Sequence, residues 1–156
     1  MAGHFANIAA HLPEMARLQP DTPAIFCPNG KNPDRTPRYT QTTYRELDDE
    51  SNRIAQALEA YGISRGVRTV LMVPPGRDFF ALTFALFKVG AVPILIDPGM
   101  GVKNLKACIA EAEPQAFIGI PKAHVARLLL SWGKPTLKIL LTVGKFALWG
   151  GTTLRR

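Results

Sequence analysis

Four continuous apolar runs alternate with amphipathic segments between residues 69 and 143 of this 156-residue sequence. A strand whose residues are continuously hydrophobic is covered on both of its faces, and parallel strands joined by helical crossovers meet that requirement. The sequence therefore predicts an α/β fold, with a layered, mainly parallel sheet and helices on both faces. The four predicted strands are TVLMV (69–73), AVPILI (91–96), QAFIGI (115–120) and LKILLTV (137–143).

Helical spacing recurs between these runs and in the segments that precede them. Thr43 and Glu46 stand three residues apart as a capping box, in which each side chain binds a free backbone amide at a helix start. A helix is expected from this box to Gly62, where glycine permits a left-handed stop. Its polar face is expected to carry Asp48, Asp49, Glu50 and Arg53. The other predicted helices are residues 4–18, 78–90, 101–112 and 122–132.

The segment between the first two predicted helices is rich in proline, which predicts extended pieces and turns. AIFC (24–27) and RYT (38–40) are expected to be the two strands of a hairpin, with residues 28–37 as its loop. No repeat or linker divides the chain, so its length indicates one domain.

The net charge of +7 comes from the last third of the sequence, because residues 101–156 carry nine Lys or Arg against two Asp or Glu. Such a basic block fits a solvated face, an acidic partner or acidic lipid. Its lysines are scattered singly without interleaved aromatic residues, so nucleic acid is not expected as a partner. The longest apolar stretch, residues 79–96, is interrupted by Lys88 and Pro93, and no transmembrane segment is expected.

Two cysteines, Cys27 and Cys108, have neither CxxC spacing nor a histidine-rich neighbour, which argues against a metal site and a disulfide scaffold. No secretion leader opens the sequence, so a cytoplasmic location is expected. The basic block also allows contact at a membrane surface.

Ligands of parallel α/β sheets gather beyond the carboxyl ends of the strands. Three predicted loops lie there: PPGRD (74–78), DPGMG (97–101) and PKAH (121–124). In the first loop, Arg77 is interpreted as a surface charge and Asp78 as a helix cap, while backbone amides could hold an anion. In the second, Asp97 is interpreted as a turn-former. The candidate substrate-proximal residues are Asp97, Met100 and Gly101.

Recognisable catalytic patterns are absent from the sequence: there is no nucleophile elbow, no close carboxylate pair and no cysteine in a basic neighbourhood. The histidines His4, His11 and His124 are predicted to be surface or half-buried side chains, not metal ligands. The sequence therefore predicts no catalytic residue, no cofactor-binding residue and no metal site within the 156 residues.

Three segments nevertheless form an ordered set: YRELDDESNRIAQALEAYGI (44–63), RTVLMVPPGRDF (68–79) and ALFKVGAVPILIDP (85–98). They resemble the amino-terminal part of the AMP-forming acyl-activating enzymes, which include acyl-CoA synthetases, luciferases and peptide-synthetase adenylation domains. The resemblance covers residues 14–122, and residues 97–134 look more particularly like the β-lactone synthetase branch of bacterial long-chain olefin synthesis. It implies that residues 1–156 are a partial AMP-binding domain, an incomplete amino-terminal subdomain of an adenylate-forming enzyme.

The resemblance also implies a reaction, in which a full-length enzyme uses ATP and Mg²⁺ to convert a carboxylate into an acyl-adenylate and pyrophosphate. In the β-lactone branch, a 3-hydroxyl of the same molecule then displaces AMP. The family's Gly-rich phosphate loop, its ribose-binding Asp and the catalytic Lys of its mobile carboxyl-terminal domain would all follow Arg156. The 156 residues are therefore expected to bind no cofactor and to be inactive alone, with the missing carboxyl-terminal portion of the same enzyme as partner.

Two other interpretations stay open from the residues alone. One is a self-contained α/β module that holds a nucleotide or anion at residues 74–78. The other is a basic domain that docks on a membrane surface or a partner through its last third. An incomplete sheet would also leave an unpaired edge, so self-association through that edge is expected.

Overall fold

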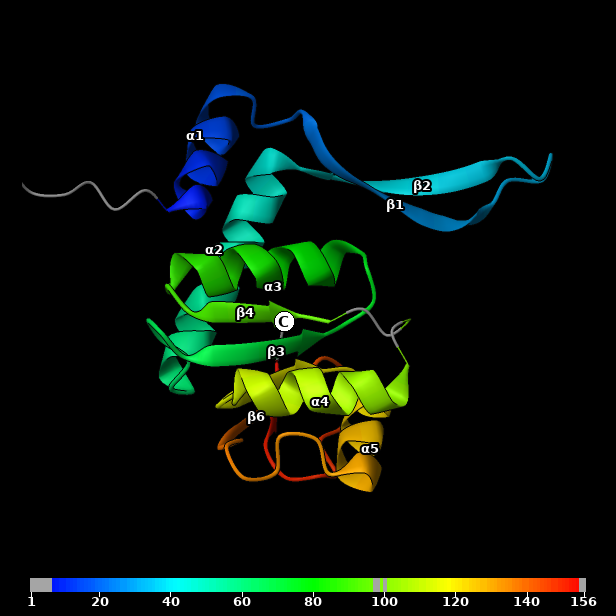
Figure 1. The fold of residues 1–156 in the computed structure, drawn as a ribbon. Coiled ribbons are helices and arrows are strands. Elements are labelled where there is room, and N and C mark those ends of the chain that lie inside the picture. Colours follow the sequence, from blue (N-terminus) through cyan, green and yellow to red (C-terminus); the bar gives the residue numbers. More distant parts are fainter. Residues whose placement is uncertain (1–6, 97–98, 100, 155–156) are drawn as a thin grey trace, which may run out of the picture.

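A five-stranded parallel sheet forms the centre of the computed structural model, which describes residues 7–96, 99 and 101–154 (Figure 1). The strand order is β4-β3-β5-β6-β7, and each neighbouring pair is parallel. This arrangement confirms the predicted α/β class, and all four apolar runs form strands. The strands are β3 (Arg68–Met72), β4 (Val92–Leu95), β5 (Ala116–Gly119), β6 (Ile139–Thr142) and the short β7 (Thr152–Thr153), which was not predicted.

Helices cover both faces of this sheet, as continuous hydrophobicity requires. One face packs Leu71, Ile118 and Leu141 against α2 and α3. The other face packs Val70 and Phe117 towards α4 and α5. The helices are α2 (Tyr44–Ala60), α3 (Arg77–Lys88), α4 (Val102–Ala112) and α5 (Pro121–Leu130).

The capping box that opens α2 forms as predicted, with the Glu46 amide donating to Thr43 Oγ1 at 3.2 Å and the Thr43 amide donating to Glu46 Oε2 at 2.8 Å. Gly62, just past the end of α2, has a φ of +86°, the left-handed conformation expected at the helix stop. The two boundaries of α2 that local signals predicted are therefore confirmed.

An antiparallel hairpin projects from the body of the molecule (Figure 1) and is made of β1 (Pro23–Lys31) and β2 (Pro37–Thr43). The hairpin prediction is confirmed, although its strands extend further towards the tip than expected. The preceding segment is a short 3₁₀ helix, η1 (Ile8–Ala10), followed by α1 (His11–Leu18). Pro13 lies in the first turn of α1, where its missing amide hydrogen breaks no helical hydrogen bond.

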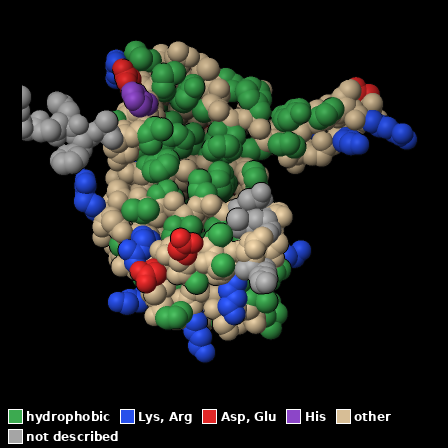
Figure 2. Space-filling model, in the orientation of Figure 1, with side chains coloured by type: hydrophobic (Ala, Val, Ile, Leu, Met, Phe, Trp, Pro, Cys, Tyr) green, Lys and Arg blue, Asp and Glu red, His purple; other side chains and the backbone are tan. Residues whose placement is uncertain are grey.

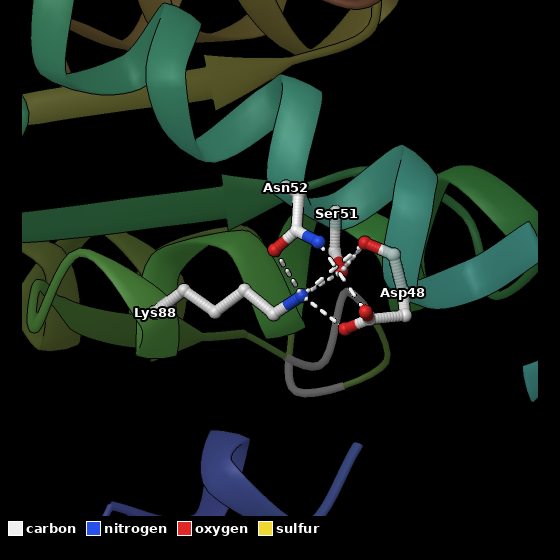
Figure 3. A network of polar contacts seen from close by, with 4 residues as sticks. All are labelled: Asp48, Ser51, Asn52 and Lys88. Atoms are coloured by element: carbon white, nitrogen blue, oxygen red, sulfur yellow. Dashed lines mark hydrogen bonds and ion pairs between the residues drawn. The ribbon is translucent and has the colours of Figure 1, made fainter. Parts of the chain in front are cut away.

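The carboxyl end of α3 is tied to α2 by the ammonium group of Lys88 (Figure 3). Its Nζ donates to Asp48 Oδ1 at 2.6 Å, to Ser51 Oγ at 2.8 Å and to Asn52 Oδ1 at 2.7 Å. The Lys88 and Asp48 side chains are 12% and 14% exposed. The expected exposed position of Asp48 is therefore wrong, because α3 packs over it and supplies a counter-ion.

Among the described residues, no helix is both long and apolar enough to cross a membrane. Cys27 is half-buried and Cys108 is exposed, and both thiols are free.

We expect Lys88→Met to lower the free energy of unfolding by about 2 to 3 kcal/mol, because it leaves the Asp48 carboxylate largely buried without its cation. Urea unfolding would measure this change. Lys138→Met, at an exposed lysine of the same chain, is the matched control and should change stability by less than about 0.5 kcal/mol. Equal effects of the two substitutions would show that the Lys88 contacts do not stabilise the fold.

Candidate functional site at the carboxyl edge of the sheet

The carboxyl ends of the parallel strands lie along one edge of the sheet, where α/β folds place their ligands. An open cleft of about 950 Å³ lies at this edge, between α2, the start of α3 and the segments that flank β7. Its lining residues are Glu50, Arg53, Ile54, Arg77, Asp78, Leu82, Val143, Gly144, Lys145, Thr153 and Leu154. Of the three predicted loops, the one at residues 74–78 therefore contributes to the cleft.

An ion pair between Arg77 and Glu50 forms one wall of the cleft. Arg77 is the first residue of α3, and its Nε donates to Glu50 Oε2 at 2.6 Å. Glu50 is buried, with 6% of its surface exposed. Arg77 is exposed, with 45% of its side-chain surface accessible, as a surface charge would be, but it is paired with Glu50. The placement of Glu50 on an exposed polar face is wrong.

A sequence signal for the burial of Glu50 did exist. Glu50 follows Leu47 by three residues and precedes Ile54 by four, so it lies on the apolar stripe of α2. The cap of α3 also differs from the interpretation: Gly76 is the capping residue and Asp78 lies inside the first turn. A carboxylate in that turn still interacts favourably with the helix dipole.

The cleft combines three cationic side chains with two carboxylates. Arg53, Arg77 and Lys145 face it together with the amino end of α3, whose free amides add partial positive charge. Glu50 and Asp78 supply the negative groups. This mixture favours the oxygens of a carboxylate or phosphate over a cation. Among the described residues that line the cleft there is no Ser or Cys that could act as a nucleophile.

A buried histidine lies behind the same edge, in the first turn of α5. His124 is fully buried and donates from Nε2 to the Leu141 carbonyl at 2.9 Å. Its ring stacks on Trp149 with 5.1 Å between centroids, and Trp149 Nε1 donates to Thr142 Oγ1 at 2.9 Å. The expectation of a surface or half-buried imidazole is therefore wrong for His124, because the segment after β6 folds back over it.

The electrostatics of this cluster keep the imidazole neutral. Burial lowers the pKa of His124, and the nearby Arg127 lowers it further, while the Leu141 and Gly119 carbonyls oppose these effects. Burial also lowers the pKa of Arg127, whose guanidinium carbon lies 5.9 Å from the centroid of the Phe117 ring. The stack therefore holds a neutral ring beneath Trp149 and fastens the segment that leads to β7.

Of the candidate substrate-proximal residues, Asp97 and Met100 lie outside the described residues. Gly101 is exposed, has a φ of +84° and precedes α4 as its capping residue. It does not line the cleft, which lies beside β6 and β7 and not beside β4. Within the described part of the chain, no group of three His, Cys, Asp or Glu residues is placed to hold a metal ion.

Comparison with known proteins decides the family. A model of the AMP-binding enzyme family matches residues 12–149. The chain belongs to that family. The resemblance found in the sequence is thereby confirmed, and the match extends over nearly all the described residues.

The olefin beta-lactone synthetase of Stenotrophomonas maltophilia is 55% identical over 150 residues, which cover 95% of this chain and 27% of that protein. The olefin beta-lactone synthetase of Xanthomonas campestris is 53% identical over 153 residues, which cover 97% of this chain and 27% of that protein. The chain therefore spans about a quarter of the length of these members of the family.

A solved structure shows the same fold in a more distant protein. The anthranilate CoA ligase AuaEII, determined in complex with anthranoyl-AMP, superposes with a TM-score of 0.76 at 17% identity. The superposition covers 94% of this chain and 26% of that one. At this identity the likeness shows the fold alone, and it agrees with the α/β class predicted from the sequence.

Stability should depend on pH through His124. Because its pKa is lowered in the folded chain, the unfolded chain binds the proton more readily as the pH falls below about 6.5. The contribution of neutral His124 to the free energy of unfolding is therefore complete above that pH. It declines as the pH falls towards the lowered pKa of the folded chain. We expect His124→Phe to flatten this decline in urea unfolding measured across the range, whereas His11→Gln, at an exposed histidine, should preserve it. An unchanged slope in His124→Phe would contradict the buried neutral ring.

The close approach of Gly151 to β6 provides a test of how β7 is held. A Cβ at Gly151 would lie 2.7 Å from Leu140 Cβ, whereas one at Gly150 would meet nothing within 4 Å. Both glycines have positive φ, so backbone strain is common to Gly151→Ala and Gly150→Ala. We expect Gly151→Ala to destabilise the fold by about 2 kcal/mol more.

Hydrogen exchange at the Leu154 amide, which donates to the Thr142 carbonyl at 2.9 Å, would report the position of β7 directly. It should accelerate in Gly151→Ala and remain close to the original rate in Gly150→Ala. Similar exchange in both variants would mean that the close contact does not position β7.

Proposed function

We propose that this chain is the amino-terminal part of an ATP-dependent enzyme that adenylates a long-chain 3-hydroxy fatty acid and closes the product to a β-lactone. The observation that carries the proposal is the 55% identity over 150 residues to an olefin beta-lactone synthetase. Transfer of the same acyl group to CoA, as in acyl-CoA ligases, is the alternative fate of the adenylate. Because ATP is a cytoplasmic cosubstrate, the proposal also assigns the enzyme to the cytoplasm.

The proposed reaction has two covalent steps. The substrate carboxylate attacks the α-phosphate of ATP, so that a phosphorus–oxygen bond forms and pyrophosphate leaves. The 3-hydroxyl then loses its proton and attacks the activated acyl carbon, closing the ring as AMP departs. Since nucleophile and electrophile belong to one molecule, the second step gains an effective molarity of about 10⁵ M or more when the two groups are well oriented.

The described residues do not fit a complete site for ATP or Mg²⁺. The sequence has no Gly-rich phosphate loop, and the described part of the chain holds no cluster of metal-binding side chains. Transfer of a phosphoryl or adenylyl group depends on such electrostatic stabilisation. We therefore assign no catalytic step to these residues, and the 156-residue chain is proposed to be inactive alone.

A structural role fits these residues better. The sheet brings Arg53, Arg77 and Lys145 to one edge, and the His124–Trp149 stack holds the segment that enters β7 beside the same edge. Further sequence of the enzyme would then start from a defined position next to a cleft suited to anionic groups. The part proposed for this chain is therefore to position that sequence and one wall of the site.

The partner proposed for this chain is the rest of the same enzyme. Figure 2 shows hydrophobic side chains gathered over the upper half of one face and along the hairpin. Phe80, Val92 and Leu95 are 38%, 47% and 53% exposed although they are large and apolar. Without that partner, the edge strand β4 is proposed to support self-association, which sedimentation velocity would detect as concentration-dependent growth in mass.

Two measurements test the proposal. Pyrophosphate release from ATP and a 3-hydroxy fatty acid should be undetectable with the 156-residue chain. The same chain should restore release, and β-lactone formation, when it replaces the matching segment of the Stenotrophomonas protein. The control hybrid carries instead the matching segment of the 2,3-dihydroxybenzoate-AMP ligase of Bacillus subtilis, which is 32% identical to this chain over 112 residues. It tests whether a less similar segment of the same family also restores activity.

The outcomes separate the parts of the proposal. Activity of the isolated chain would overturn its inactivity alone. Micromolar binding of ATP to the isolated chain by calorimetry would favour a self-contained nucleotide-binding module. A folded hybrid enzyme that forms no adenylate would overturn the assignment of the chain to a β-lactone synthetase.

A further inference from the structure

The outer face of α5 exposes apolar side chains that no described element covers. Val125, Leu128 and Leu129 are 46%, 52% and 78% exposed. They lie on one arc of the helix together with the exposed Lys122, because residues three, six and seven apart return to the same side. The opposite arc, with Ala123, His124 and Arg127, is buried. The helix therefore buries an arc that includes two polar side chains and presents a second arc, largely apolar, to the outside.

The surroundings of this outer face are cationic. After Glu113 the sequence contains no Asp or Glu, while Lys122, Lys134 and Lys138 are exposed around α5 and the turn that follows it. In the half of the molecule that contains α4 and α5, Figure 2 shows basic side chains projecting outwards, with acidic side chains also present on the face in view. Helix α5 itself and the turn that follows it carry lysines and no carboxylate, so their charge favours an anionic occupant.

The residue types favour lipid over protein as that anionic occupant. Hot spots of protein interfaces are enriched in Trp, Tyr and Arg, and Leu and Val are under-represented there. Helices that lie in a membrane interface combine Leu with flanking Lys. The Lys ammonium is a compact point charge that can bind a lipid phosphate, but it lacks the planar fork with which Arg pairs with a carboxylate. The exposed face of α5 has the second composition.

The position of α5 also suits a flat surface. Figure 1 places it at the end of the molecule remote from the β1–β2 hairpin. It covers the face of the sheet opposite to α2 and α3, so it is distinct from the apolar surface proposed for the rest of the enzyme. A planar partner can therefore reach α5 without meeting the hairpin.

From these observations we infer that the outer face of α5 docks on an anionic phospholipid bilayer, with Val125, Leu128 and Leu129 in the interface and Lys122 and Lys134 at the lipid phosphates. The inference does not depend on the proposed adenylating activity. It assigns the basic last third of the chain to a membrane surface, where a long-chain acyl compound would also partition.

Vesicle co-sedimentation of the 156-residue chain tests this inference, with phosphatidylcholine vesicles compared with vesicles that also contain phosphatidylglycerol. We expect binding to the anionic vesicles only. The binding should be lost in about 1 M salt, where the Debye length falls to about 3 Å. Val125→Ser/Leu128→Ser should lower the partition coefficient about tenfold.

Val92→Ser/Leu95→Ser on β4 is the matched control, because these residues have the same types and are 47% and 53% exposed, close to the 46% and 52% of the test pair. It should leave the partition coefficient unchanged. Lys122→Gln/Lys134→Gln should weaken binding about fivefold for each charge removed, and Lys31→Gln/Arg35→Gln on the hairpin should not. The lysine variants decide the test if the serine variants fail to fold by circular dichroism.

Four results would overturn the inference. They are equal binding to neutral and anionic vesicles, no binding to either, binding that the α5 variants leave unchanged, and binding that the β4 control weakens as strongly. Salt-sensitive binding to polyglutamate without vesicle binding would assign the face to an acidic protein. A dimer in sedimentation velocity that Val125→Ser/Leu128→Ser abolishes would assign it to a second copy of the chain.

Discussion

Burial of both faces of a parallel sheet is the constraint on which this structure depends. Strands such as β3 and β5 present apolar side chains alternately to the two sides, with Leu71 and Ile118 on one and Val70 and Phe117 on the other. Neither set can be left in water, so the connections must be helices and must cover both sides. The parallel order then follows, and with it the gathering of strand ends and loops at a single edge.

Charged residues at the two ends of α3 orient this helix against α2. Arg77 at its first turn binds Glu50, and Lys88 at its last turn binds Asp48, so both ends of α3 are joined to α2. Apolar contacts alone tolerate sliding between helices, whereas two ionic contacts far apart on one helix, each to a largely buried carboxylate, specify its angle. The first of these contacts also forms a wall of the cleft, which links the packing of two helices to the shape of the candidate site.

Membership of the AMP-binding enzyme family gives these features a common interpretation. The cationic cleft and the His124–Trp149 stack lie at the edge of the sheet where such folds bind ligands. The outer face of α5 lies elsewhere, over the opposite face of the sheet, and combines exposed leucines with lysines. One compact unit therefore separates a wall of the proposed acyl-activating site from a surface proposed to reach the source of a lipid substrate.

Local order in the chain determined most of the architecture by itself: the four apolar runs specified strands, the Thr43–Glu46 box specified a helix start, and three ordered segments indicated the family. Each of these patterns involves residues that are close in sequence, so it can be recognised before the fold is known. Only the tertiary structure decided that Lys88 meets Asp48 forty residues away, that Glu50 and His124 are buried, and that two threonines form β7. Contacts of this kind arise from elements distant in sequence, and a side chain's exposure depends on what packs over it, so no local pattern contains them.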